Sequence, residues 1–348
     1  MMPEEWPIAA PAADGNAPAR LAGRGRLSTV RRDFFLDPAK RLTEQERALM
    51  TAMLHCLVSD VADAIRAALP GGRLAANDEG DAALIETLTA SGLLDEPGLM
   101  SLLLRRADEE RIATAARARS GRREARVLQG LVSHDYGAVA AAAMALILGR
   151  GRRRDRFGQC LVSFDDLPAG SAEILSYAIA AGLRRELAGG RGVAVADLEL
   201  AEAAGSVFER RDEERGIDAL TAALVHLLDE GAGLTDELVL AAAHEGEIAF
   251  VAEVLARRAA VPTAAAIDEL LSGEPRFVMA LLRAADVSRD LGAGLLASIG
   301  DLIGIDDAGA AITLFDGMTD AEVQATRSWL VTTADYRAAL ERLGQGRG

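Results

Sequence analysis

The clearest signal of the fold lies in residues 238–288, which read LVLAAAHEGEIAFVAEVLARRAAVPTAAAIDELLSGEPRFVMALLRAADVS. It contains the motif G-E-x-x-F-V twice, and the two copies begin 27 residues apart, at positions 246 and 273. Each copy leads into an apolar segment that carries arginines. A repeat of this length is typical of stacked helical hairpins, because each unit is too small to bury its apolar face alone.

The two copies supply eight signature residues, to which we assign a structural role. They are Gly246, Glu247, Phe250, Val251, Gly273, Glu274, Phe277 and Val278. In each unit the acid lies near the start of the next helix, where it suits the positive end of the helix dipole. The Phe and Val that follow are placed to pack on a neighbouring helix.

The rest of the chain also shows helical periodicity. Residues 43–69 carry apolar side chains at three- and four-residue spacing, and Thr43 with Glu46 predicts a capping box at their start. Shorter helices are predicted for 81–91, 97–118, 122–133, 137–149, 171–188 and 197–228. Strand signals are almost absent. The fold class that we predict is all-α, with stacked antiparallel helical hairpins behind a long leading helix.

The composition divides the chain into four parts. We predict a flexible leader at 1–27, because a segment rich in Pro, Ala and Gly without periodicity cannot repay the cost of ordering. A long N-terminal helix region follows at 28–72. The first helical-repeat segment is 73–195, with a basic loop at 150–156. The second helical-repeat segment, with the C-terminal helices, is 196–348.

A family resemblance supports this architecture. The run at 238–288, together with LTEQERALMTAMLHCLVSDVADAIRAAL at 42–69, resembles an alphaproteobacterial family known as domain of unknown function 2336. Members of that family look like HEAT-type helical-repeat proteins. The resemblance covers residues 30–290 loosely and is clearest at 238–288. It implies a bacterial HEAT-like α-solenoid, and it brings with it no known activity and no catalytic residue.

Composition and charge indicate a globular protein of the cytoplasm. Of the 348 residues, 50% are hydrophobic and 26% charged, with a formal net charge of −15. The N-terminus has acids where a signal peptide needs basic residues. The longest uncharged run, Tyr136 to Gly149, is shorter than the about 18 residues that a membrane span requires. We therefore expect no membrane partner, and we expect Cys56 and Cys160 to be reduced.

Motifs for catalysis and for cofactor binding are missing from the sequence. The sole lysine, Lys40, lies outside any G-x-x-x-x-G-K-[ST] pattern, which excludes a phosphate-binding P-loop of that type. The four histidines have none of the spacings that bring three or four ligands to a zinc ion. We therefore expect no cofactor, no metal and no catalytic residue, and a protein that is not an enzyme.

Charge is distributed unevenly along the chain. Residues 105–156 hold 13 arginines against six acids, a net charge of +7, whereas residues 197–247 hold 14 acids against three arginines, a net charge of −11. The densest basic part contains the candidate contact residues Arg150, Arg152, Arg153, Arg154 and Arg156. Glycines and the repulsion of like charges favour an exposed loop there.

Three interpretations of these arginines stay open. They form a solvated loop between repeats, or they dock an acidic partner or the chain's own acidic stretch, or they bind phosphates of a nucleic acid or nucleotide messenger. The net negative charge of the chain and the lack of aromatic residues interleaved with the arginines make nucleic acid the less favoured partner.

The function that the sequence favours is binding. We expect an adaptor or scaffold for another protein, with a regulatory role, and a second copy of the chain would also fit as partner. The alternative is a nucleic-acid-binding protein of the DNA-glycosylase type, in which a helical stack holds the duplex and the basic loop acts together with Trp329. Trp329 fits a packing role near the C-terminus better than a role in contacting a DNA lesion.

Overall fold

The computed structural model describes residues 42–70, 78–121, 126–188, 193–231 and 233–343. Contacts divide the chain into two units, Met1–Arg47 and Ala48–Gly348. Only residues 42–47 of the first unit are described, so the leader predicted at 1–27 lies outside the described residues. Except for the first residues of one helix, all elements below belong to the second unit.

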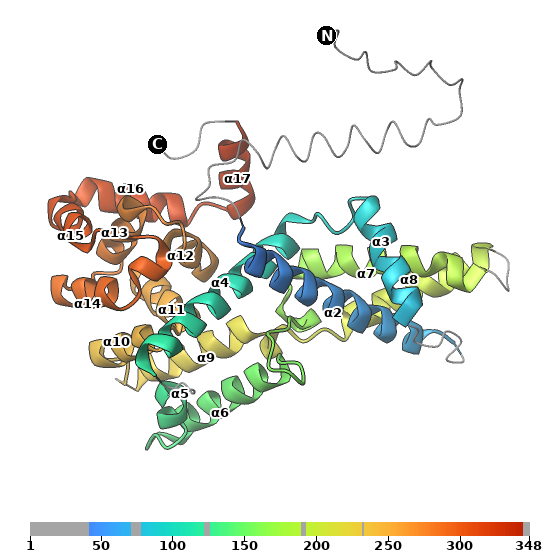
Figure 1. Cartoon of the computed structure of the whole chain (residues 1–348), viewed down its shortest axis with the longest axis horizontal. Coiled ribbons are helices and arrows are strands. Elements are labelled where there is room, and N and C mark those ends of the chain that lie inside the picture. The colour runs from blue at the N-terminus through green and yellow to red at the C-terminus, as the bar shows by residue number, and fades with distance from the viewer. Residues whose placement is uncertain (1–41, 71–77, 122–125, 189–192, 232, 344–348) are drawn as a thin grey trace, which may run out of the picture. The chain divides into compact units, whose positions relative to one another are not determined.

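The described part of the chain is helical and contains no β-strand, which confirms the predicted all-α class (Figure 1). The α-helices are α2 (Glu44–Ala68), α3 (Asp78–Ala90), α4 (Pro97–Ser120), α5 (Arg126–Leu131), α6 (Gly137–Arg152), α7 (Ala169–Ala188), α8 (Val193–Glu209), α9 (Ile217–Glu230), α10 (Asp236–His244), α11 (Ile248–Ala259), α12 (Thr263–Leu270), α13 (Pro275–Ala284), α14 (Arg289–Ile299), α15 (Ala308–Gly317), α16 (Asp320–Leu330) and α17 (Ala334–Arg342). Within the described ranges, three 3₁₀ helices lie between them: η2 (Phe164–Asp166), η3 (Glu213–Arg215) and η4 (Asp301–Ile303).

The long leading helix is α2, and its start confirms the predicted capping box. The Glu46 amide donates to the Thr43 hydroxyl at 3.1 Å, and the Thr43 amide donates to the Glu46 carboxylate at 2.8 Å. Among the described helices, α2 alone is long and apolar enough to cross a membrane. A core helix has the same composition, and α2 buries Met53 and Leu57 along one side.

The structure splits one predicted helix into two. The apolar pattern predicted a single helix over 197–228, whereas the chain forms α8 and α9 with the short helix η3 between them. The Asp212 side chain accepts a hydrogen bond from the Glu214 amide, and Gly216 has extended backbone angles (φ −63°, ψ 145°). Aspartate competes with the helix backbone in this way, a local signal that apolar periodicity overlooks.

A second difference concerns the exposed basic loop predicted at 150–156. Helix α6 continues through Arg152, and the residue that follows it, Arg153, is buried. Basic side chains in the last turn of a helix interact favourably with the negative end of its dipole, so Arg150 and Arg152 extend the helix rather than end it. The exposed loop is therefore shorter than the sequence predicted.

A continuous hydrophobic core joins residues of α4–α6 with residues of α9–α16. Helix α11 lies at its centre, since ten of its 12 residues are buried and it packs against α4, α9, α10, α12 and α13. Helices α7 and α8 pack along each other (Figure 1). Trp329 on α16 is half-buried and packs on the continuous core.

The two copies of the repeat motif adopt the same turn. Gly246 and Gly273 have positive φ angles of 73° and 72°, and each lies two residues before a helix, α11 and α13 respectively. Those helices also end alike, because Ala260 and Asp286 both adopt the left-handed conformation (φ 56° and 52°). The sequence match thus corresponds to a match of local backbone structure.

The surroundings of the two copies differ. Among the signature residues that follow the glycines, Glu247, Phe250, Val251 and Val278 are buried, Phe277 is half-buried and Glu274 is exposed. A Cβ atom at position 246 would lie 2.8 Å from the Cα of Ala113 and 3.0 Å from the carbonyl oxygen of Ile112, both on α4. At position 273 the nearest atom would be 3.7 Å away. Position 246 therefore needs glycine for conformation and for space, and position 273 for conformation alone.

We predict a graded response to alanine at three glycines. Gly246→Ala should destabilise the fold by about 2–4 kcal/mol, since a left-handed alanine and an overpacked contact add up. Gly273→Ala should cost about 1–2 kcal/mol. Gly130→Ala, on α5 with nothing near its Cβ position, should be neutral or stabilising by up to about 1 kcal/mol. Urea denaturation followed by circular dichroism measures all three, and equal effects at positions 246 and 273 would contradict the close contact with α4.

Candidate functional site

The five candidate arginines do not form one exposed cluster. Arg150, Arg153 and Arg154 each form an ion pair within the chain, whereas Arg152 and Arg156 are exposed. In the part of the chain that the structure describes, no acid pairs with the latter two. The partner of Arg150 is an acid from the acidic stretch 197–247, so this arginine makes the intramolecular contact that one interpretation predicted.

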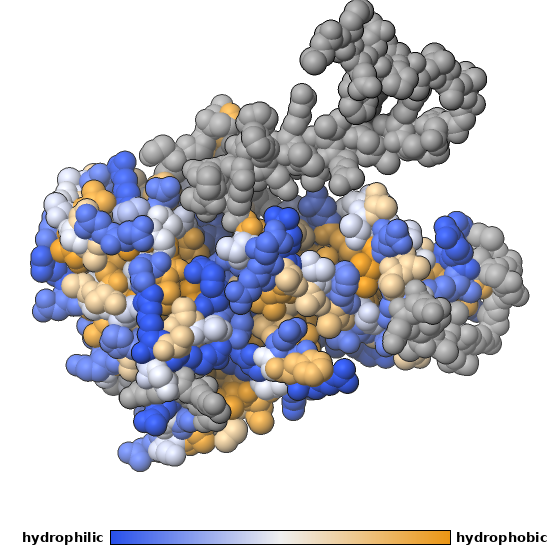
Figure 2. Space-filling model, viewed as in Figure 1, coloured by the Kyte–Doolittle hydropathy of each residue, from blue (hydrophilic) through white to orange (hydrophobic). Residues whose placement is uncertain are grey.

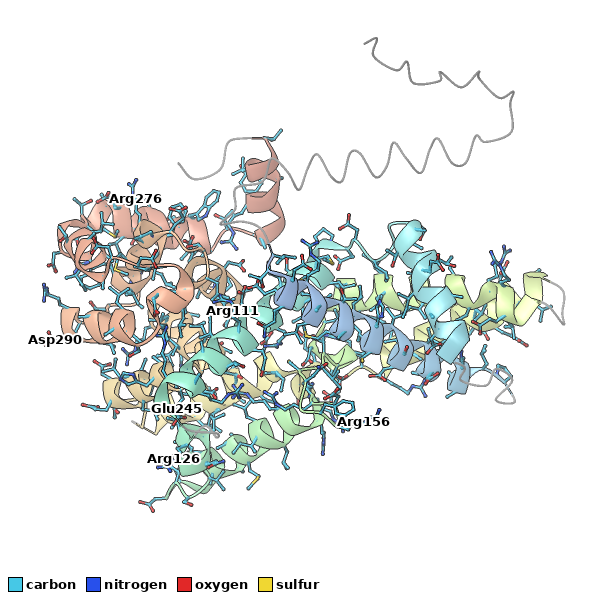
Figure 3. All side chains as sticks on the ribbon, in the orientation of Figure 1. Arg111, Arg126, Arg156, Glu245, Arg276 and Asp290 are labelled. Carbon is cyan, nitrogen blue, oxygen red and sulfur yellow. The ribbon has the colours of Figure 1, made fainter. Side chains whose placement is uncertain are left out.

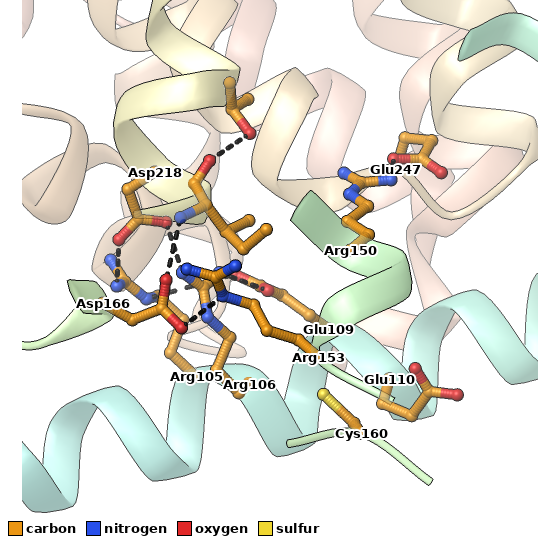
Figure 4. Close-up of polar contacts among 12 residues, drawn as sticks. Arg105, Arg106, Glu109, Glu110, Arg150, Arg153, Cys160, Asp166, Asp218 and Glu247 are labelled. Atoms are coloured by element: carbon orange, nitrogen blue, oxygen red, sulfur yellow. Dashed lines mark hydrogen bonds and ion pairs between the residues drawn. The ribbon is translucent and has the colours of Figure 1, made fainter. Parts of the chain in front are cut away.

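Arg153 is held by Asp166, a buried carboxylate at the end of η2 (Figure 4). Its Nε donates to Asp166 at 2.7 Å, and its other nitrogens donate to the carbonyl oxygens of Gly149 (3.1 Å) and Arg215 (2.8 Å). Asp166 also accepts a hydrogen bond at 2.8 Å from the amide of Ile217, the first residue of α9. One carboxylate therefore neutralises the arginine that follows α6 and satisfies the start of α9.

Helix α4 carries a second group of paired charges. Arg105 and Arg106 donate to the carboxylate of Asp218 on α9, at 2.5 and 2.7 Å, and Arg106 also donates to Glu109 at 2.7 Å. Burial alone would raise the pKa of the Asp218 carboxyl, but the charges of Arg106 and Arg105 outweigh it and lower that pKa below its usual value. Asp218 is therefore ionised at neutral pH and ties α4 to α9.

Two glutamates hold the remaining arginines of this region. Glu247, in the turn before α11, accepts from Arg150 at 2.5 Å. Glu110, on α4, accepts from Arg154 at 2.8 Å and from Arg117 at 3.0 Å. These contacts connect α4, the C-terminal end of α6 and the turn between α10 and α11.

The same residues surround a pocket of about 380 Å³. Its wall combines charged side chains with apolar ones such as Ile147 and Ile248. Cys160 also lines it, and burial, followed by the nearby charge of Glu110, raises the pKa of this thiol to about 11. The thiol is therefore protonated at neutral pH, the state in which cysteine is a poor nucleophile.

Residues 153–161 form a tight loop that presents Phe157. The amide of Asp155 donates to the carbonyl oxygen of Gln159 at 3.0 Å, and the Asp155 carboxylate accepts from the amides of Phe157 (2.8 Å) and Gln159 (2.7 Å). Phe157 is nevertheless 75% exposed, and the Arg156 guanidinium lies over its ring, 4.7 Å from the centroid. Figure 3 shows Arg156 beyond the C-terminal end of α6.

The outer side of α6 is apolar and exposed. Met144 is 41% and Leu148 53% exposed, and no charged residue lies between Tyr136 and Gly149. Figure 2 shows hydrophobic residues over α5 and α6 at the lower edge of the view. Met144, Leu148 and Arg152 follow one another at four-residue spacing and so share one side of the helix. We refer to these three residues, together with Arg156 and Phe157, as the α6 face.

Two of the histidines take part in separate local contacts. The ring of His134 accepts a hydrogen bond from the Tyr136 amide at 3.1 Å, and His226 lies 3.3 Å from Glu230. Among the described residues, no group of three or more His, Cys, Asp or Glu side chains is arranged to hold a metal ion.

Sequence reasoning named the arginines of this region but missed their partners. Asp166 and Asp218 are two of 53 acids, and Arg106 and Asp218 are 112 residues apart, so no spacing connects them. The one local signal was the capping box that Ser163 forms with Asp166, which marks the short helix η2. Phe157 has no signal of its own, because exposure is not a property of a single sequence position.

A comparison with known families gives one match. The family model described as uncharacterised protein conserved in bacteria, DUF2336, matches residues 83–328. This range includes the pocket and the α6 face, and the match confirms the family resemblance of the sequence. No curated protein and no solved structure matches the chain.

We predict that Asp166→Ala destabilises the fold by about 3–5 kcal/mol. The substitution leaves the buried charge of Arg153 unpaired, and it removes the acceptor of the hydrogen bond from the Ile217 amide at the start of α9. The matched control is Asp197→Ala, which breaks an ion pair with Arg184 in which both side chains are exposed. The control should change the free energy of unfolding little. Urea denaturation measures both variants, and similar effects of the two would contradict the role assigned to Asp166.

Proposed function

We propose that this chain, which belongs to the bacterial family DUF2336, is a non-enzymatic adaptor that binds another protein through the α6 face. The observation that carries the proposal is Phe157, a 75% exposed aromatic side chain on a loop fixed by its own hydrogen bonds. Aromatic side chains are enriched among the residues that dominate binding energy at interfaces. A fixed loop also loses little conformational entropy on binding, which favours affinity.

The charges around the α6 face favour a partner with acidic side chains. Met144 and Leu148 form an apolar strip, and Arg152 and Arg156 lie beside it without an acidic partner among the described residues. An apolar strip with basic neighbours complements an amphipathic helix that carries both apolar side chains and acids. The partner that we propose is therefore an acidic amphipathic segment of another protein, and a second copy of this chain is the alternative occupant.

The architecture that we propose is a stack of antiparallel helical hairpins of the HEAT-like solenoid type. The matched turns at Gly246 and Gly273 support it, as does the order of contacts, in which α10 packs on α11, α11 on α12 and α12 on α13. Each unit of such a stack contacts mainly its neighbours and leaves a long surface free for binding. We place the protein in the cytoplasm, with a regulatory role and without a cofactor.

The DNA-glycosylase-type alternative has less support. It needs a basic loop that faces the duplex, but three of the five arginines are engaged by acids of the same chain. It also needs Trp329 at the surface of a binding groove, and this side chain packs on the core instead. Nucleic acid cross-linked at position 157 is therefore the result that would favour this alternative.

The proposal predicts a specific cross-link at position 157. With the photoreactive residue p-benzoylphenylalanine in place of Phe157, irradiation of the native cell should attach one defined protein to the full chain. The same residue in place of Val331, an exposed apolar position on the C-terminal side of α16, should not attach that protein. Purified partner should then bind Phe157→Ala at least about tenfold more weakly than the unmodified chain.

The melting temperature of the variant and the adducts formed from position 331 are the controls for this test. Phe157→Ala should leave the melting temperature unchanged, because an exposed side chain contributes little to the core. Identical adducts from positions 157 and 331 would contradict a docking role for the α6 face. Recovery of nucleic acid at position 157, with affinity that falls steeply between about 50 and 200 mM salt, would favour the alternative function instead.

A further inference from the structure

The pocket between α4, α6 and the turn before α11 has the dimensions of a ligand site. Its volume of about 380 Å³ falls within the range typical of small-molecule pockets. Residues from distant parts of the chain meet in its wall, among them Glu110, Ile147 and Gly246. The pocket is distinct from the α6 face, since Ile147 lines it whereas the next residue, Leu148, is exposed at the outer side of the helix.

Positive charge exceeds negative charge among three arginines that line the pocket and the two glutamates that pair with them. Three guanidinium groups, those of Arg117, Arg150 and Arg154, share the two carboxylates of Glu110 and Glu247. Arg117 and Arg154 both depend on Glu110, so that carboxylate compensates only one of them. An anion that enters the pocket therefore meets an excess of one positive charge in this group.

The other charges around the pocket do not change this balance. The α4 network contains two arginines and two acids, namely Arg105, Arg106, Glu109 and Asp218. Arg153 is neutralised by Asp166. Both groups are neutral as a whole, so the excess stays with the three guanidinium groups nearest to solvent.

Hydrogen-bond capacity indicates which anion fits. A guanidinium group has five N–H donors, and within the described residues Arg150 uses one of them, toward Glu247. A ligand carboxylate would only repeat the contact that the two glutamates already make. A phosphate monoester carries more charge and three acceptor oxygens, so it can bind several guanidinium groups at once.

The rest of the wall favours a ligand with an apolar part. Leu128, Ile147, Ile248 and Ala249 line the pocket beside the arginines. Inorganic phosphate would leave this surface in contact with water, whereas a compact ring or branched chain attached to the phosphate would cover it.

We infer that this pocket binds a small organic phosphate monoester. The phosphate contacts Arg117, Arg150 and Arg154, and the apolar body packs on Ile147 and Ile248. The inference concerns a site separate from the α6 face, so it stands whether or not that face binds a protein.

Calorimetric titration of the full chain with phenyl phosphate tests the inference. We expect one binding site, with an affinity at least about tenfold higher than that of phenylacetate, which has the same ring and a carboxylate. The double variant Arg150→Gln with Arg154→Gln should weaken binding by at least about tenfold, because charge-assisted hydrogen bonds are lost. Arg117→Gln should also weaken it, and this side chain, 32% exposed on α4, is the safer substitution for folding.

The matched control is Arg152→Gln, which removes the same charge from the outer side of α6 and should bind phenyl phosphate like the unmodified chain. Methyl NMR spectra locate the ligand: the signals of Ile147 and Ile248 should shift, and that of Ile174, exposed on α7, should not. Circular dichroism confirms that each variant is folded. Absence of binding, unchanged affinity in folded Arg117→Gln and double variants, equal affinity for phenylacetate, or shifts confined to other isoleucines would each overturn the inference.

Discussion

Asp218 on α9 pairs with two arginines of α4, Arg105 and Arg106, and this contact holds the two helices together. Without it, the buried guanidinium of Arg106 would face Glu109 alone, while Arg105 would lose its closest acid. Unpaired charge in such a place is strongly destabilising. Once α9 is held against α4, Asp166 lies where it can satisfy the start of α9 and neutralise Arg153. The paired charges thus fix α6, α9 and the loop of residues 153–161 that follows α6 relative to α4.

A segment with many arginines is therefore not the same as a basic surface. The net charge of +7 at residues 105–156 suggests an external patch, but most arginines at the end of α6 point toward acids of other helices. Helical phase decides which side chains remain outside, since successive residues are rotated by about 100° around the axis. Arg150 and Arg153 share the inner side of this turn, whereas Arg152 faces solvent. On this surface, Arg152 and Arg156 lie beside the apolar strip of Met144 and Leu148.

Much of the fold could be predicted because its signals are local. The capping box at Thr43, the paired motifs at 246 and 273 and the apolar periodicity each depend on residues that are close in sequence. The ion pairs could not be predicted, because they join residues that only the tertiary structure brings together. The division between α8 and α9 was missed for a third reason. Residues 209–215, which separate the two apolar segments, are all charged, and most of them are glutamates and arginines, which are good helix formers, so they do not by themselves mark the turn that Asp212 and Gly216 impose.

Helix α6 lies between the pocket and the α6 face, and its apolar residues contribute to both. A helix that is apolar on all sides is normally buried, yet α6 lines a pocket on one side and faces solvent on the other. Arg154, a pocket residue, also contacts the loop that carries Phe157, because it donates to Glu110 at the pocket and to the carbonyl oxygen of Gly158 in that loop. Coupling between the sites would require that this loop has two conformations and that the ligand binds them with different affinity. A phosphate that competed with Glu110 for Arg154 would have that property if it changed the contact by which, among the described residues, Arg154 connects this loop to α4.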